Sequence, residues 1–249
     1  MNNQIQFANI LFSGKCNLSC KYCIGQLRKN PTSNLTTFPL PGLESFIREC
    51  HKLGVREISF SGTNTEPLLY VYLDKLIERL RKEIPSVKLS LHTNGFLILR
   101  KKSLVELFDR LSLSFYSFRE DTRFLMTGTK KMPDIKTLIN KLSIPLKVSI
   151  LYTKENQFEL EEMLDCFLEM GVRRLVLRKV SGFEGPDNPF QNQVPLRYFG
   201  NNPVYEFRGM ELSWWDFEKS SLSCLNLFAD GRLSQEYNLQ EVSVLKQIA

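Results

Sequence analysis

The chain has 249 residues, of which 43% are hydrophobic and 24% are charged, as is typical of a globular protein that buries a full core. Its 33 Lys and Arg residues outnumber the 27 Asp and Glu residues and give a formal net charge of +6, but they are scattered, so a nucleic-acid partner is not expected. No apolar stretch reaches the ~18 residues of a membrane span and no signal-peptide pattern is present, so we expect a cytoplasmic protein without a membrane partner.

From residue 5 to about residue 180, short β-like segments alternate with amphipathic helical segments. Strands are expected at residues 5–12, 55–61, 87–93, 111–117, 145–152 and 173–180. Helices are expected between most of them, most clearly at 41–54, 68–85 and 158–171. Repeated β–α units predict a parallel sheet with helices on its outside. Because six units are fewer than the eight of a closed barrel, we expect an α/β fold, a partial (β/α)6 TIM-like barrel.

The character of the sequence changes after this region. Residues 181–195 are rich in Gly, Pro and Asn and predict a long loop. The segment LNLFADGRLSQ (225–235) places Asp230–Gly231 between alternating residues, which predicts a β-hairpin. We therefore divide the chain into a barrel domain, residues 1–180, and a C-terminal extension, residues 181–249, that is expected to cap the barrel.

The segment GKCNLSCKYC holds Cys16, Cys20 and Cys23 directly after the first expected strand. Parallel α/β folds carry their chemistry at this carboxyl end of the strands. A structural zinc site takes four ligands in paired spacing, whereas three thiols share this loop and the chain has only two histidines. Three thiolates on a cube-shaped iron–sulfur cluster leave one iron without a protein ligand. The pattern therefore indicates a cluster whose open iron binds something else.

The CxxxCxxC spacing, with Tyr22 before the last cysteine, resembles the signature of the radical S-adenosylmethionine (radical SAM) family. The resemblance covers the element order from about residue 5 to 180. It implies a [4Fe–4S] cluster on the three cysteines and SAM bound to the open iron. An electron from the cluster would cleave SAM to methionine and a 5′-deoxyadenosyl radical, which would take a hydrogen atom from the substrate. It also implies an electron donor such as flavodoxin or ferredoxin.

Polar residues follow the next strands at the positions where the family binds SAM. The segment ISFSGTNTEP resembles the glycine-rich turn that meets the SAM amino group, although it carries extra residues between glycine and glutamate. The alternative is a polar turn that only precedes a helix. By resemblance, the expected SAM-binding residues are Tyr22, Gly62, Thr63, Asn64, Thr65, Glu66, Asn94, Ser114 and Ser149.

The fourth expected strand, LSLSFYS, resembles the branch of the family that contains the molybdenum-cofactor GTP-rearranging enzyme, with Tyr116 in place of an aspartate. The similarity continues through FLMTGT, LKVSILYTKEN and GVRRLVLRKV. Candidate catalytic or substrate-binding residues are His92, Tyr116, Arg178 and Lys179. His92 could equally fill the barrel interior, and Arg178 and Lys179 could equally be solvated charges at a strand end.

The extension also limits this resemblance. The branch carries ligands of a second cluster before its DG hairpin, whereas here only Cys224 is present, so neither a second cluster nor the GTP rearrangement is expected. Cys224 is expected to be buried, as are Cys50 and Cys166 on their helices. Trp214 and Trp215 could pack the extension over the barrel mouth or stack on a flat substrate.

These features predict a radical SAM enzyme that abstracts a hydrogen atom from its substrate. A small anionic metabolite, a nucleotide or cofactor precursor, and a peptide are all compatible substrates. The rival hypothesis is a regulatory or interaction module that binds zinc or an iron–sulfur cluster without SAM chemistry.

Overall fold

A computed structural model describes residues 5, 7–23, 25, 32–180 and 185–235. Its strands form one sheet in the order β11-β10-β1-β2-β3-β4-β5-β6-β9-β8-β7. The strands are β1 (Phe7–Phe12), β2 (Glu57–Gly62), β3 (Lys88–Thr93), β4 (Arg110–Phe115), β5 (Leu146–Tyr152), β6 (Arg174–Lys179), β7 (Arg197–Phe199), β8 (Asn202–Phe207), β9 (Met210–Trp215), β10 (Leu225–Leu227) and β11 (Leu233–Ser234). The helices are α1 (Leu43–Leu53), α2 (Leu73–Glu83), α3 (Lys102–Val105), α4 (Glu120–Thr127), α5 (Ile135–Lys141) and α6 (Leu160–Glu169).

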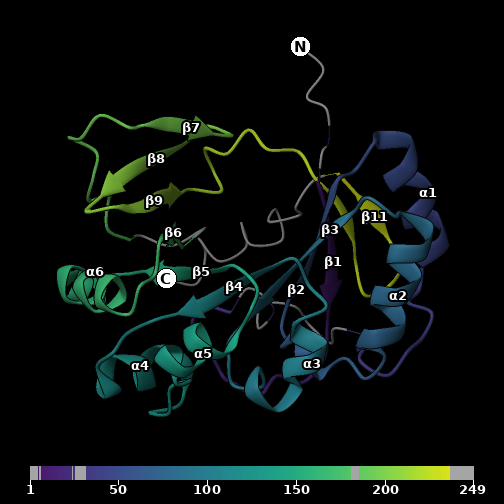
Figure 1. The fold of residues 1–249 in the computed structure, drawn as a ribbon, viewed down its shortest axis with the longest axis horizontal. Coiled ribbons are helices and arrows are strands. Elements are labelled where there is room, and N and C mark those ends of the chain that lie inside the picture. Colours follow the sequence, from purple (N-terminus) through teal and green to yellow (C-terminus); the bar gives the residue numbers. More distant parts are fainter. Residues whose placement is uncertain (1–4, 6, 24, 26–31, 181–184, 236–249) are drawn as a thin grey trace, which may run out of the picture.

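Strands β1 to β6 lie side by side in chain order and are all parallel. The sheet curves, and α1 to α6 lie on the outer side of the curve (Figure 1). Because the described sheet ends at β11 on one side and at β7 on the other, it is an open barrel. The predicted α/β fold with a partial (β/α)6 barrel is confirmed, and each of the six predicted strands overlaps an observed one.

The helices are held against the sheet by the apolar faces that their periodicity encodes. In α1, Leu43, Phe46, Ile47 and Cys50 are buried, which confirms the core position predicted for Cys50. The helix ends at Gly54, whose φ of 66° suits a residue without a side chain. Helix α2 begins later than predicted, because a short 3₁₀ turn, Pro67–Leu69, precedes it and Tyr70 is extended.

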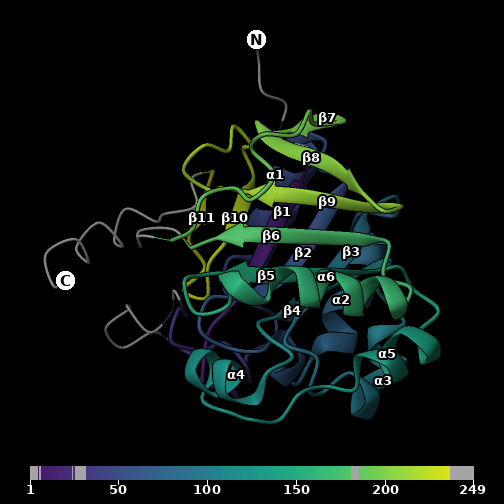
Figure 2. The same ribbon diagram turned by 90° about the vertical axis from the view of Figure 1, so that its left-hand side faces the viewer.

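The C-terminal extension adds strands to both edges of the barrel sheet. Strand β9 lies parallel to β6, and β8 and β7 follow it in antiparallel order (Figure 2). Strand β10 lies parallel to β1 and pairs with β11, so the hairpin predicted at Asp230–Gly231 is confirmed. The sequence did not predict β7, β8 and β9. Residues 185–195 contain no helix or strand, as expected for a loop, and residues 181–184 and 236–249 lie outside the described residues.

Aromatic packing joins the extension to the barrel. Trp214 is buried, and its ring meets Tyr152 edge to face at a centroid distance of 6.0 Å. Side chains alternate along a strand, so these two lie on the face opposite to Ser149. Trp214 therefore packs within the fold, on the face that meets the helices. Cys224 is buried, and its sulfur accepts a hydrogen bond from Asn9 at 3.3 Å.

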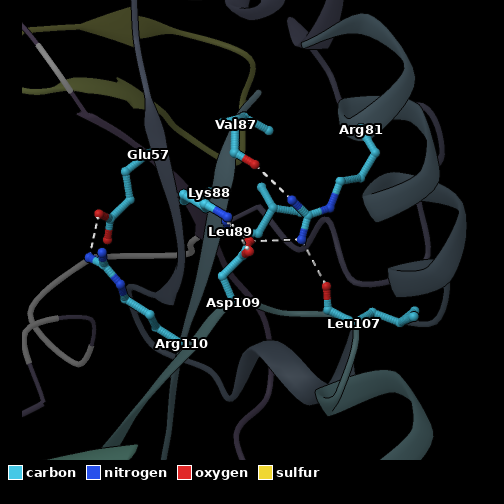
Figure 3. A network of polar contacts seen from close by, with 8 residues as sticks. All are labelled: Glu57, Arg81, Val87, Lys88, Leu89, Leu107, Asp109 and Arg110. Atoms are coloured by element: carbon cyan, nitrogen blue, oxygen red, sulfur yellow. Dashed lines mark hydrogen bonds and ion pairs between the residues drawn. The ribbon is translucent and has the colours of Figure 1, made fainter. Parts of the chain in front are cut away.

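A polar network ties α2 to the beginnings of β3 and β4 (Figure 3). The Asp109 carboxylate accepts hydrogen bonds from Arg81 at 2.8 Å and from Lys88 at 3.1 Å. It also accepts one from the backbone N–H of Leu89 at 2.8 Å. Burial alone would raise the pKa of Asp109, but these bonds outweigh it and hold the pKa below its ordinary value. The network stabilises the end of the sheet opposite to the cysteines.

Candidate active site

A cavity of about 490 Å³ lies at the carboxyl ends of the barrel strands. Parallel strands bring their following loops to this one edge. Every residue predicted for the cluster, SAM or the substrate lines this cavity: Cys16, Cys20, Tyr22, Cys23, Gly62, Thr63, Asn64, Thr65, Glu66, His92, Asn94, Ser114, Tyr116, Ser149, Arg178 and Lys179.

The cysteine loop (residues 13–23) is fastened to the ends of β2 and β3. The backbone N–H of Gly14 donates to Oδ1 of Asn64 at 3.0 Å. The hydroxyl of Thr65 donates to the carbonyl oxygen of Lys15 at 3.0 Å. Nδ2 of Asn94 donates to Oδ1 of Asn17 at 2.8 Å. Asn64, Thr65 and Asn94, which the sequence predicts to bind SAM, therefore also position the loop that carries the cysteines.

The opposite side of the cysteine loop is fastened to α4 and to the loop after β5. The backbone N–H groups of Ser19 and Lys21 donate to carbonyl oxygens at the end of α4. Nζ of Lys21 and the hydroxyl of Tyr22 donate to Glu155 at 2.7 and 2.6 Å. Burial opposes the charge of Glu155, but these bonds and that of Thr153 lower its pKa to about 2. The sequence analysis did not single out Glu155, although this residue lies in LKVSILYTKEN, one of the segments that resemble the family.

The three cysteines of the loop form no disulfide with any described residue, and all three are half-buried. Burial is the main cause that raises the pKa of Cys16 and that of Cys20, the latter to about 11. Negative charge nearby adds to both pKa shifts: that of Glu66 and Cys23 for Cys16, and that of Cys23 and Cys16 for Cys20. The hydroxyl of Tyr116 lies 3.5 Å from Sγ of Cys20, and Sγ of Cys23 lies 3.7 Å from the carbonyl oxygen of Thr63. Iron must displace the thiol protons when it binds.

This donor set fits an iron–sulfur cluster. Among the described residues, no three His, Cys, Asp or Glu side chains converge on a point as ligands of a single ion would. A [4Fe–4S] cube instead takes each cysteine on a separate iron, so its ligands surround a larger space. Three thiols that line one cavity, outside any disulfide among the described residues, have the chemistry that such a cluster requires.

The turn after β2 leaves no room for a side chain at Gly62. A Cβ atom there would lie 1.7 Å from the carbonyl oxygen of Thr65. The buried Glu66 carboxylate accepts hydrogen bonds from the backbone N–H groups of Leu68 at 3.2 Å and Asn94 at 2.8 Å. Burial raises its pKa to about 7 despite these bonds. Glu66 thus joins the ends of β2 and β3 from inside the protein.

Polar side chains of β3 to β6 form another part of the cavity wall. Ser114 of β4 stands directly beside Ser149 of β5, and both line the cavity. Burial, followed by the positive charges of Lys147 and Arg178, lowers the pKa of His92 to about 3. The imidazole of His92 is therefore neutral at neutral pH and a weak base.

The extension reaches the cavity through two contacts. Lys179 pairs with Asp216 at 3.4 Å and with Glu218 at 3.9 Å, so its charge is compensated from the segment after β9. Phe217, which sequence reasoning did not single out, lines the cavity and stacks edge to face with Trp215 at 5.9 Å. No local pattern marks Phe217, because its place depends on β9 pairing with β6.

Comparison with known families agrees with this geometry. Residues 10–167, more than half of the chain, match the model of the radical SAM superfamily. This chain belongs to the radical SAM superfamily. The predicted recognition is confirmed, and so are the predictions that the protein is an enzyme and that its cofactors are a [4Fe–4S] cluster and SAM. Among the described residues, no helix of this radical SAM protein is long and apolar enough to cross a membrane.

Curated relatives of this radical SAM chain point to the predicted branch. It is 24% identical over 261 residues to the GTP 3′,8-cyclase of Sulfurimonas denitrificans, covering 92% of this chain and 79% of the relative. It is 30% identical over 170 residues to a probable GTP 3′,8-cyclase of Methanocella arvoryzae, covering 65% of this chain but only 53% of the relative.

Solved structures agree on the fold. SuiB of Streptococcus suis bound to its precursor peptide SuiA superposes with a TM-score of 0.57 and 24% identity, over 72% of this chain and 40% of SuiB. SuiB bound to SAM superposes with a TM-score of 0.56 and 23% identity, over 75% of this chain and 42% of SuiB. Similarity at this level shows that the fold is shared and nothing narrower.

Proposed function

We propose that this radical SAM enzyme holds its cluster on Cys16, Cys20 and Cys23 and acts on a small anionic substrate of the nucleotide or cofactor-precursor type. The observation that carries the proposal is that the three thiols line the same cavity as Ser114, Ser149 and other polar residues of four successive strands. When bound, the cluster and SAM supply a 5′-deoxyadenosyl radical that takes a hydrogen atom from the substrate.

The turn after β2 shapes the SAM site chiefly through its backbone. The hydroxyl of Thr63 donates to the carbonyl oxygen of Phe12 at 3.0 Å, and the side chains of Asn64 and Thr65 bind the cysteine loop. These side chains are thus already engaged inside the protein. We assign them to holding the turn, and Gly62 lets the backbone of Thr65 pack closely against the end of β2. The remaining predicted contacts with SAM are Tyr22, Glu66, Asn94, Ser114 and Ser149. Tyr22, Glu66 and Asn94 also bind protein groups, so Ser114 and Ser149 are the side chains we propose to contact SAM directly.

The positive charge near β5 and β6 favours an anionic substrate. His92 and Arg178 line the cavity, and the charges of both Arg178 and Lys147 act on His92. Guanidinium and ammonium groups stabilise phosphate and carboxylate groups. The relatives named GTP 3′,8-cyclase support a nucleotide-type substrate. Because Lys179 is paired with Asp216, its proposed role is to join β6 to the extension rather than to bind the anion.

The extension is proposed to close one side of the site, with Phe217 as its contact. A cytoplasmic location and an electron donor such as flavodoxin or ferredoxin remain parts of the same proposal. The GTP rearrangement is not proposed, because Cys224 is the single cysteine of the extension and the companion ligands of a second cluster are missing from the sequence.

Anaerobic reconstitution with iron and sulfide tests this proposal. With dithionite and SAM, the brown protein should release 5′-deoxyadenosine, and the triple variant C16A/C20A/C23A should not. Incubation with nucleotides deuterated on the ribose and on the base should then transfer deuterium into 5′-deoxyadenosine for the true substrate class. A colourless protein that binds zinc and leaves SAM intact would contradict the assignment and support the interaction module.

A further inference from the structure

Tyr116 lies against one sulfur of the cysteine loop, although 96 residues separate it from Cys20 in the sequence. Its hydroxyl is 3.5 Å from Sγ of Cys20, within hydrogen-bond reach for sulfur. The residue follows β4 directly, so its side chain enters the cavity from the barrel side of the cysteine loop.

The backbone of Tyr116 is held in place independently of any cofactor. Its carbonyl oxygen accepts a 2.7 Å hydrogen bond from Nδ2 of Asn156, which also donates to the carbonyl oxygen of Leu151 at 2.9 Å. Asn156 is completely buried. The preceding Phe115 packs against Phe167 at 4.8 Å. The fold therefore sets the position of the Tyr116 hydroxyl before iron binds.

The direction of this hydrogen bond follows from the chemistry of the two groups. A cysteine that ligates iron is a thiolate and has no proton to donate, whereas a phenol is a donor at neutral pH. When Cys20 ligates iron, Tyr116 must therefore be the donor and the Cys20 thiolate the acceptor. The side-chain contacts of the other two sulfurs differ, since Cys16 meets Oδ1 of Asn17 and Cys23 meets the carbonyl oxygen of Thr63. Those oxygens are acceptors and give a thiolate no hydrogen bond, and the hydrogen bonds that lower the pKa of Cys16 come from the backbone of Leu18 and Asn17. Among the described contacts, Tyr116 is therefore a side-chain donor to a sulfur of the loop.

We propose that Tyr116 is a positioning residue that donates a hydrogen bond to the Cys20 thiolate and raises the reduction potential of the cluster. Reduction adds negative charge to the cluster, and hydrogen bonds to ligand sulfur stabilise that charge. The proposal rests on the cluster assignment made above. It gives Tyr116 a role toward the cluster itself, apart from any contact with SAM or the substrate.

The test compares the wild-type protein with Tyr116→Phe and with Tyr152→Phe. Tyr152 is also buried at the end of its strand, but it faces away from the cavity, so it controls for the loss of a phenolic hydroxyl. Each reconstituted protein is titrated with dithionite and followed by electron paramagnetic resonance without SAM or substrate. Tyr116→Phe should disfavour reduction by about threefold, which for a one-electron couple is about 30 mV toward lower potential. Tyr152→Phe should match the wild type.

A second measurement needs only a variant that takes up the cluster. In deuterium oxide, electron–nuclear double resonance of the reduced wild-type cluster should show an exchangeable hydrogen that Tyr116→Phe lacks. Equal potentials in all three proteins, or a shift that appears only when SAM is added, would overturn the proposal for Tyr116. A wild-type protein that takes up no cluster would overturn the cluster assignment as well. Because this result is seen in the wild type alone, it is distinguishable from a failure of the proposal for Tyr116.

Discussion

The hydroxyl of Tyr22 donates a 2.6 Å hydrogen bond to the carboxylate of Glu155, which lies 133 residues later in the chain. Lys21 donates to the same carboxylate oxygen at 2.7 Å. The side chain of Glu155 is only 7% exposed, so this is a largely desolvated contact between the cysteine loop and the loop after β5. Charged hydrogen bonds of this kind contribute more than neutral ones.

Replacing Glu155 with alanine should loosen the cysteine loop. Loss of the charged acceptor leaves Tyr22 without this partner, and we expect a decrease of about 1–3 kcal/mol in the free energy of unfolding and less iron per protein after reconstitution. Glu162→Ala is the control, because it removes an exposed ion pair with Arg119, and neither of these residues lines the cavity. Urea unfolding and iron analysis measure both effects. Equal iron content in the two variants would show that Glu155 does not organise the loop.

Replacing Gly62 with alanine should damage the turn after β2. The added Cβ atom would lie 1.7 Å from the carbonyl oxygen of Thr65, so the backbone must move. We expect a loss of about 3 kcal/mol in stability and the loss of SAM binding in calorimetry. Gly185→Ala is a matched control, since a Cβ there would meet no described residue within 4 Å. If Gly62→Ala bound SAM as tightly as the wild type, the turn would not form part of the SAM site.

Replacing any one of Cys16, Cys20 and Cys23 with serine should abolish a stable cluster. Each cysteine is expected to hold a separate iron, and a hydroxyl is a much poorer ligand for iron in such clusters. Cys166 is half-buried rather than buried as predicted, and it lies outside the cavity. Cys166→Ser should therefore keep the brown colour and the iron content of the wild type. Retention of the cluster by a variant of the loop would rule out that cysteine as a ligand.

Replacing Asp109 with asparagine should destabilise the protein in a pH-dependent way. The pKa of Asp109 is lower in the folded state, so the ionised carboxylate contributes stability that is fully present above its unfolded pKa. That contribution is lost as the pH falls through the folded value, below the ordinary 3.8. Urea unfolding at pH 7 should show a loss of about 1–3 kcal/mol, and the difference from the wild type should narrow below pH 4.

Asp121→Asn provides the comparison for this experiment. Asp121 is 94% exposed and pairs only loosely with Lys130 at 3.3 Å. Its replacement should change stability by less than about 0.5 kcal/mol at either pH. A pH-independent difference between Asp109→Asn and the wild type would mean that the ionisation of Asp109 does not contribute to stability. Equal stability of the two proteins at pH 7 would mean that the amide replaces the carboxylate fully in the network.

Local sequence patterns determined much of this protein. The alternation of β3 placed Leu89 and Leu91 in the core and His92 toward the cavity, because side chains of a strand alternate between its faces. The spacing of Cys16, Cys20 and Cys23 identified the loop after β1, because donors so close in sequence must share one site. The Asp230–Gly231 hairpin followed from the backbone freedom of glycine, whose φ is 88° here.

Tertiary structure alone decided which distant segments meet. Strand β9 pairs with β6 at one edge of the barrel strands, and β10 pairs with β1 at the other. Their own residues do not predict these partners, because backbone hydrogen bonding between strands is nearly independent of sequence. The same holds for the contacts of Glu155 with Tyr22 and of Tyr116 with Cys20. Local periodicity reports the face on which a residue lies. Its neighbours across the cavity depend on how the whole sheet curves, and this curvature brings Tyr116 and Glu155 to the cysteine loop.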